Sequence, residues 1–188
     1  MVQDEVQVEV FDSMAGSAGL GFMVWEAWQM SQAGAGLTEI LARMRVIRQG
    51  MLIFLTLQDL RFVQMSGLVS ALQFALASLL DVKPIIEVDE NGALRSLYSV
   101  RGRKKALKKL VEEALKDRSD FSDTIVGIVH GEDEESAVLF EEIMREQIAP
   151  ARVLHSCVGC AIGAHTGRGI LGLVFTDQDK EEYKAYQA

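Results

Sequence analysis

The residues best suited to chemistry lie in the stretch GAHTGRG, residues 163–169, just before a strongly apolar run. His165 can donate a hydrogen bond as a neutral tautomer or as a cation, and the hydroxyl of Thr166 can donate or accept one. The flanking glycines let the backbone approach a ligand closely or adopt a positive φ. Such a turn can contribute to a ligand site. On its own, however, a histidine on a glycine turn more often makes a structural hydrogen bond.

The two cysteines of the chain form one CVGC pair, Cys157 and Cys160. A pair at this spacing serves as a redox motif or as half of a zinc site, for which His155 and His165 are the nearest further ligands. Here the pair lies among Val, Gly, Ala and Ile, so we favour two small apolar residues in a buried strand. An enzyme that uses Cys157, one of these histidines and Asp12 is a weaker hypothesis, because nothing supplies an obvious oxyanion site.

The elements that must position these residues begin with a strand and two helices. Alternation with a period of two predicts a strand over residues 6–13, and helical spacing predicts a helix within residues 15–34. The stripe at helical spacing on that helix consists of Leu20, Val24, Ala27, Trp28 and Ser31. Thr38 is the predicted N-cap of a second helix, which Gly50 ends, and residues 51–57 are predicted to form a buried strand.

The rest of the chain repeats strand and helix patterns. The predicted elements are, in order, a short helix (58–67), a well-buried helix (68–80), a hairpin around Asn-Gly (82–101), an amphipathic helix (102–117), a strand (123–131), a helix (132–149), two strands around the glycine turn (151–167 and 168–176) and a charged tail (177–188).

This order predicts an α/β protein with a mixed sheet, because a hairpin lies among β-α-β units. The clearest boundary falls around residues 56–59. We therefore expect residues 1–56 to form a partial N-terminal α/β lobe. Residues 57–188 are expected to form a self-contained C-terminal domain.

The bulk composition excludes several classes of protein. Of the 188 residues, 49% are apolar and 24% are charged, so the chain can bury a core. A formal net charge of -8 makes nucleic acid a poor partner. No apolar run is long enough to span a membrane, and no signal peptide precedes the first strand. These features predict a cytoplasmic protein.

Several collinear stretches resemble the DegV family of bacterial fatty-acid-binding proteins. Residues 10–34 carry the DS pair and a glycine-rich turn before a helix, residues 55–112 carry KP, NG and VRGRKKAL, and residues 162–175 carry HTGRG. The KP–NG–VRGRKKAL and HTGxG blocks are the most specific. The resemblance covers most of the chain and implies a DegV-type α/β fold.

The resemblance also implies a ligand and a place for it. In the family, an acyl chain enters an apolar tunnel in the C-terminal domain, and its carboxylate lies where the HTGxG motif lines the junction of two domains. The ligand-binding residues that we predict on this basis are His165, Thr166, Gly167, Arg168, Ser70, Phe62, Phe74 and Leu76. We expect no catalytic residue, no metal and no cofactor besides the bound long-chain fatty acid.

This sequence departs from the family pattern in three places. The segment that carries the carboxylate-binding hydroxyls ahead of the DS pair is absent from it. In the glycine-glycine-arginine signature, Ser66 replaces the first glycine and Leu68 replaces the arginine. Arg168 stands where the family has proline, beside His165, so we hypothesise that Arg168 takes over as the cation for the head group.

Two functions follow from these observations. The first is a non-catalytic carrier that binds a long-chain fatty acid and presents it to a fatty-acid kinase, since the chain has neither a phosphate-binding glycine loop nor a nucleophile elbow. The second is a structural or interaction module that has lost fatty-acid binding. Because a lobe without its neighbour exposes an apolar face, we expect a homo-oligomer in both cases.

Overall fold

The computed structural model describes residues 6–66, 81–117, 120–122 and 124–176. The elements are α1 (Ser17–Gln32), α2 (Leu37–Gln49), β1 (Met51–Thr56), α3 (Arg61–Met65), β2 (Val82–Val88), β3 (Leu94–Arg101), α4 (Arg103–Asp117), β4 (Ile125–His130), α5 (Glu134–Arg145), β5 (Arg152–Cys157), α6 (Cys160–Thr166) and β6 (Leu171–Thr176). The predicted helix at residues 68–80 and the predicted tail at 177–188 lie outside the described residues.

The six strands form one mixed sheet in the order β3-β2-β1-β6-β4-β5. Only β4 and β5 pair in parallel, and the other neighbours are antiparallel. This arrangement confirms the predicted α/β class with a mixed sheet. Strand β1, at the end of the predicted N-terminal lobe, lies in the middle of the sheet between β2 and β6. The division of the chain at residue 56 stays a prediction.

One face of the sheet carries the larger core. Phe54 and Phe175 from the central strands pack there with the inner side of α4 and with α5. The predicted inner residues of α4 are all fully buried, namely Ala106, Leu107, Leu110, Val111 and Ala114. Amphipathic spacing therefore predicted this helix and its orientation correctly.

The opposite face is covered by α1, α3 and α6. A smaller cluster forms there from Leu57, Val63, Ile86 and Ile170, with Val158 and Ile162 packed against it. The first turns of α1 lie close against the sheet, because a Cβ on Gly127 would stand only 3.0 Å from the Cβ of Ala18 and 3.1 Å from the ring of Phe22. Glycine at this position permits that close packing.

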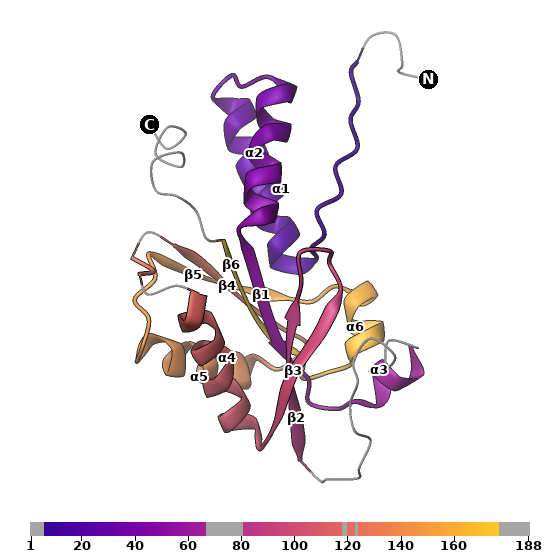
Figure 1. Cartoon of the computed structure of the whole chain (residues 1–188), viewed down its shortest axis with the longest axis vertical. Helices are drawn as coiled ribbons and strands as arrows, with labels where there is room; N and C mark the ends of the chain where they lie inside the picture. Colours follow the sequence, from indigo (N-terminus) through magenta and orange to yellow (C-terminus); the bar gives the residue numbers. More distant parts are fainter. Residues whose placement is uncertain (1–5, 67–80, 118–119, 123, 177–188) are drawn as a thin grey trace.

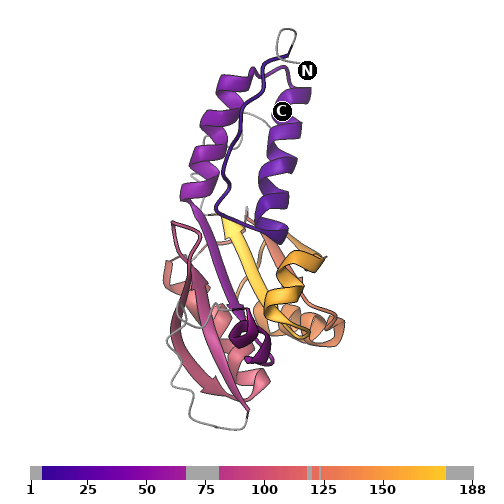
Figure 2. The ribbon, with the colours of Figure 1, turned by 90° about the vertical axis from the view of Figure 1, so that its right-hand side faces the viewer.

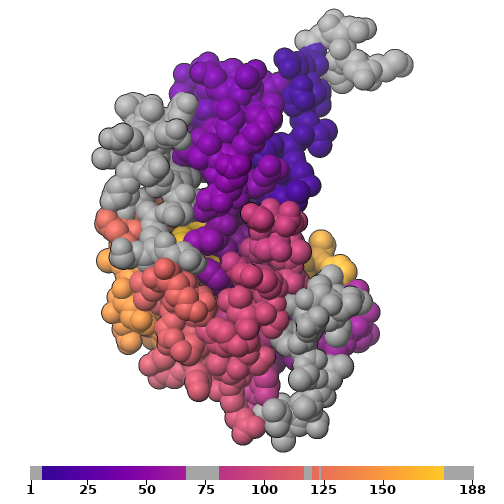
Figure 3. Space-filling view, in the orientation of Figure 1, coloured from indigo at the N-terminus to yellow at the C-terminus, as the bar shows by residue number. Residues whose placement is uncertain are grey.

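Helices α1 and α2 form a hairpin that stands off one end of the sheet (Figures 1 and 2). The space-filling view shows it as a narrower column above the broader body (Figure 3). Met23, Met44 and Ile47 form the core of the hairpin. A buried ion pair between Arg43 Nε and Glu26 Oε1, 3.0 Å apart, joins the two helices. Such a pair needs close geometry to offset the desolvation of both charges.

Three local predictions are wrong. Residues 6–13 form no strand, because no neighbouring strand in the described chain gives them backbone hydrogen bonds. Gly36 rather than Thr38 is the N-cap of α2, and its N–H donates to Glu39 Oε2 at 2.9 Å. Residues Cys160–Thr166, expected in a strand, form α6.

The predicted stripe of α1 is also not the buried one. The buried residues of this helix are Gly19, Met23, Glu26 and Met30. Leu20, Val24 and Trp28 are exposed instead. Both sides of α1 are apolar, so spacing alone does not decide which side faces the core. In the described part of the chain, no helix combines the length and the apolarity needed to cross a membrane.

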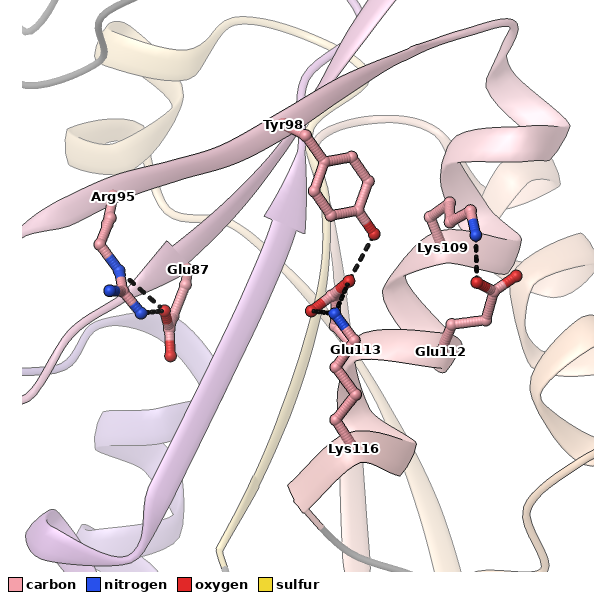
Figure 4. A network of polar contacts seen from close by, with 7 residues as sticks. All are labelled: Glu87, Arg95, Tyr98, Lys109, Glu112, Glu113 and Lys116. Carbon is pink, nitrogen blue, oxygen red and sulfur yellow. Dashed lines mark hydrogen bonds and ion pairs between the residues drawn. The ribbon is translucent and has the colours of Figure 1, made fainter.

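A polar network fastens the β2–β3 hairpin to α4 (Figure 4). The hydroxyl of Tyr98 donates to the carboxylate of the buried Glu113, which also accepts from Lys116 Nζ at 2.7 Å. Burial, the largest influence on Glu113, acts to raise its pKa, but the bonds from Lys116 and Tyr98 outweigh it and the pKa is lowered. Burial, together with the hydrogen bond to Glu113, raises the pKa of Tyr98, so its hydroxyl keeps the proton.

This network predicts a specific loss of stability in acid. A carboxyl whose pKa is lower in the folded chain stabilises it above the unfolded pKa, and that contribution is lost as the pH falls through the folded value. Glu113→Gln should therefore lower the free energy of unfolding by about 1 to 2 kcal/mol at neutral pH. The variant should also lose less stability than the wild type between about pH 5 and pH 3.

Urea unfolding at several pH values measures this difference. Glu112→Gln is the matched control, because Glu112 directly precedes Glu113 in α4 and has a 45% exposed side chain paired with Lys109. It should change the unfolding free energy little. Parallel losses for Glu113→Gln and the wild type on acidification would contradict the prediction.

Candidate functional site

The predicted glycine turn lies at an edge of the sheet where several strands end. Strands β1, β3, β4 and β5 run in the same direction, as their pairings require. Their carboxyl ends therefore meet at one edge, and β6 starts there after the turn at residues 167–170. In open α/β sheets, ligands bind outside the carboxyl ends of strands. The topology thus places the turn where a site is expected.

Backbone hydrogen bonds fix this turn to the end of β4. Gly169 N–H donates to the carbonyl of Gly131 at 2.7 Å, and Gly131 N–H donates to the carbonyl of Ile170 at 2.9 Å. Val158 N–H, just after β5, donates to the carbonyl of His130 at 2.9 Å. Backbone hydrogen bonds therefore join the turn and the segment before α6 to the end of β4.

His165 and Thr166 both come from the last turn of α6 but differ in their surroundings. The imidazole of His165 is exposed and has no hydrogen-bond partner within the described residues. The hydroxyl of Thr166 is buried and donates to the carbonyl of Ile162 at 2.9 Å. Thr166 can still accept a hydrogen bond, whereas His165 is free to donate one.

Gly167 and Phe62 are brought together, although they lie far apart in the sequence. Gly167 ends α6 with a φ of 71°, a conformation that favours glycine. A Cβ at this position would lie 2.3 Å from the ring of Phe62 in α3. The ring therefore packs directly on the turn, and 39% of Phe62 stays exposed. Glycine is required here both for its backbone angle and for this contact.

Arg168 points away from the buried part of the turn. Its Nε lies 2.9 Å from Glu132 Oε2, and the two side chains are 80% and 68% exposed. An exposed pair of this kind is weak and is screened by salt. The guanidinium is therefore available to a ligand at the mouth of the turn only in competition with Glu132.

Sequence reasoning missed a polar group beside the turn. Arg103 Nη2 pairs with Asp133 Oδ2 at 2.9 Å, and Asp133 Oδ1 accepts from the backbone of Ser136 as the N-cap of α5. The Asp133 N–H donates to Nδ1 of the buried His130 at 3.3 Å. Burial lowers the pKa of Arg103 although Asp133 opposes the shift. In the sequence, these residues stand at a strand end and at helix starts. That they lie together becomes clear only once the pairing of the strands is known.

A second cation is buried near this group. Lys83 at the start of β2 donates from Nζ to the carbonyl of Gln58 at 2.9 Å and lies 3.2 Å from Asp81 Oδ1. A Cβ on Gly169 would lie only 2.6 Å from the Cβ of Gln58, so the loop after β1 packs closely on the turn. Lys83 therefore holds the loop after β1 against the glycine turn.

The CVGC pair is not buried, contrary to the interpretation favoured from sequence. Cys157 ends β5, Cys160 begins α6, and both are exposed free thiols. His155 is paired with Glu141 at 2.6 Å. The described residues include no cluster of three or more His, Cys, Asp or Glu side chains arranged to hold a metal ion.

The hypothesis of an enzyme built on Cys157 and Asp12 is also not supported. Asp12 is next to Ser13, which lines a hollow of about 380 Å³ together with Met51 at the start of β1. Cys157 ends β5, which runs in the same direction as β1, so the two residues lie at opposite edges of the sheet. None of the predicted ligand-binding residues lines this hollow.

Three predicted ligand-binding residues, Ser70, Phe74 and Leu76, lie outside the described residues. The other members, Phe62, His165, Thr166, Gly167 and Arg168, all lie on α3, on α6 or in the turn that follows α6. These elements pack on each other and on the small apolar cluster of the same sheet face.

Comparison with known proteins places the chain in a family. The family model described as "Uncharacterised protein, DegV family" matches residues 1–178. A DegV domain-containing protein of Clostridium perfringens is 29% identical over 177 residues, which cover 94% of this chain and 61% of that protein. Protein DegV of Bacillus subtilis is 29% identical over 171 residues, which cover 90% of this chain and 60% of that protein.

Solved structures share the fold. A DegV-family protein from Thermus thermophilus, described for its fatty-acid binding, matches with a TM-score of 0.82 at 24% identity and covers 94% of this chain and 63% of that chain. One from Ruminococcus gnavus, solved with vaccenic acid, matches with a TM-score of 0.81 at 23% identity and covers 90% of this chain and 60% of that chain.

The chain thus spans about 60% of the length of these relatives. The match of the family model nevertheless extends over nearly all of it, and the structural agreement covers both the helical hairpin and the sheet. The chain belongs to the DegV family.

Proposed function

We propose that this protein binds a long-chain fatty acid without catalysing a reaction on it, with the carboxylate at the turn after α6. The main support is the position of His165, whose imidazole is exposed and has no hydrogen-bond partner among the described residues, at the edge of an apolar cluster in a chain of the DegV family. DegV-family structures from Thermus thermophilus and Ruminococcus gnavus are described with fatty-acid binding or with a bound fatty acid.

The apolar cluster supports a site for an alkyl chain. Leu57 and Ile170, which flank the central strands, are buried with Val63 of α3 in this cluster. Burial of an alkyl chain is favourable by about 0.8 kcal/mol per methylene group, so shape and apolar walls account for most of the affinity. The carboxylate then needs few partners. His165 would donate to it, and Thr166 would accept from it if it stayed protonated.

The proposed function also includes a partner, a cellular location and an oligomeric state. The fatty acid would be presented to a separate fatty-acid kinase, and the protein would act in the cytoplasm as a homo-oligomer. A second function, an interaction module without fatty-acid binding, is favoured by the exposed apolar residues Val8, Val10 and Trp28 at the helical end of the molecule.

Lipid analysis separates these two functions. Protein purified from a bacterial host should carry about one long-chain fatty acid per chain, because the transfer of an alkyl chain from water to an apolar site is favourable. Denaturation, solvent extraction and mass spectrometry measure the lipid, and rebinding of oleate to delipidated protein measures the affinity. Lipid-free protein that also ignores oleate would exclude the carrier function and leave the interaction module.

His165 provides a sharper test of the carboxylate position. His165→Ala should weaken oleate binding by about 10- to 100-fold, since a hydrogen bond to a charged group contributes about 1.5–3 kcal/mol. His155→Ala is the matched control, because His155 lies on the edge strand β5 and is paired with Glu141. Equal oleate affinities for His165→Ala and the wild type would refute the proposed position of the carboxylate at this turn.

Arg168 is the proposed replacement for the family arginine. Arg168→Ala should weaken oleate binding by about two- to fivefold, and the effect should shrink at high salt because the guanidinium is exposed. Glu132→Gln removes the competing partner of Arg168 and should shift the affinity in the opposite direction. Titration of oleate into both variants measures this, and an unchanged affinity in Arg168→Ala would refute the replacement.

A further inference from the structure

The CVGC segment joins the edge strand of the sheet to the helix that carries His165. Cys157 is the last residue of β5 and Cys160 is the first residue of α6, so only two residues separate the two thiols. Both cysteines are exposed and free. The packing role that the sequence suggested therefore does not account for them. A pair of accessible thiols at this spacing is typical of redox motifs.

Val158 holds the middle of this segment against the end of β4. Its side chain packs on the small apolar cluster, and its N–H donates to the carbonyl of His130 at 2.9 Å. A Cβ on Gly131 would lie 3.4 Å from Cγ2 of Val158, which is ordinary van der Waals contact. The segment is thus fixed at Val158, with an exposed cysteine before it and another after it.

Gly159 is the point at which the segment can bend. Its backbone is extended, with a φ of -70° and a ψ of 167°, and no described atom lies within 4 Å of the place where a Cβ would stand. Three extended residue steps span at most about 11 Å, whereas the Cα atoms of a disulfide usually lie about 5.5–6 Å apart. Rotation about Gly159 brings Cys160 toward Cys157, and both glycine and the open space allow it. Closing the pair therefore moves the first turn of α6.

Helix α6 transmits such a movement to the candidate site. It has only seven residues, so a shift of its first turn also displaces the rest of the helix. Ile162 of α6 packs on the small apolar cluster, and a Cβ on Gly16 would lie 2.9 Å from Ile162. His165 and Thr166 lie in the last turn of the same helix. The state of the two thiols is thus coupled to both the apolar and the polar part of the site.

We propose that Cys157 and Cys160 form a reversible disulfide by exchange with a low-molecular-weight disulfide, and that its formation displaces α6 and weakens fatty-acid binding. The effect on binding rests on the proposed function, whereas the exchange itself does not. One thiolate attacks a sulfur of the small disulfide and releases one small thiol, and the second thiolate then attacks the mixed disulfide and releases the other. The chain gives up two electrons and two protons, and the small disulfide takes them up as it is reduced to two thiols.

Equilibration with reduced and oxidised glutathione, in a chelating buffer, measures the exchange without any lipid. As the share of oxidised glutathione rises, the wild type should lose both free thiols and about 2 Da in mass, and reduction should restore them. Cys157→Ser and Cys160→Ser each keep one thiol and should stop at the mixed disulfide. A wild type that keeps both thiols, that also stops at mixed disulfides, or that is isolated with a stoichiometric metal ion on its thiols would overturn the proposal.

Oleate titration and hydrogen exchange of the α6 amides test the coupling to the site. The oxidised wild type should bind oleate about tenfold more weakly than the reduced form, and its α6 amides should exchange at a changed rate. The double variant Cys157→Ser/Cys160→Ser is the matched control and should match the reduced wild type at every glutathione ratio. Unchanged α6 exchange, or equal oleate affinities in the two states, would refute the coupling. A reduced protein that binds no oleate would contradict the proposed function instead, and the thiol, mass and exchange measurements still decide on the disulfide.

Discussion

The apolar character of the central strands on both sides is the constraint on which the structure depends. Phe54 of β1 and Phe175 of β6 face one side, while Leu57, directly after β1, and Ile170, directly before β6, face the other. Burial of apolar surface dominates the free energy of folding, so both faces must be covered. Helices α4 and α5 cover the first face, and α1, α3 and α6 cover the second.

Covering the second face brings together parts of the chain that are distant in sequence. Gly16, before α1, lies beside Ile162 of α6, since a Cβ on Gly16 would approach Ile162 to 2.9 Å. Phe62 of α3 lies on Gly167 after α6. The candidate site is therefore a consequence of how this face is covered. Its apolar floor is the cluster that the face would need in any case.

Polar contacts then hold the site edge in one conformation. Asp133 joins the start of α4 to the start of α5 through Arg103 and caps α5, and Gly131 holds the glycine turn through two backbone bonds. Backbone groups at strand ends need partners, and here they find them in each other. The exposed imidazole of His165 projects from this hydrogen-bonded end of the sheet.

Much of the fold follows from the sequence by itself. Periodicity identified α4 and its buried side, Asn-Gly identified the β2–β3 hairpin, and the HTGxG and VRGRKKAL blocks identified the family. These signals are local, because each depends on residues within one element. Only the tertiary structure decided which side of α1 is buried, since both sides are apolar. It also decided that residues 6–13 pair with no other described strand and that residues from Cys160 form a helix, because strands and short helices depend on contacts from elsewhere in the chain. The meeting of Phe62 with Gly167 and of Arg103 with Asp133 has the same origin, since packing over long sequence distances brings those residues together.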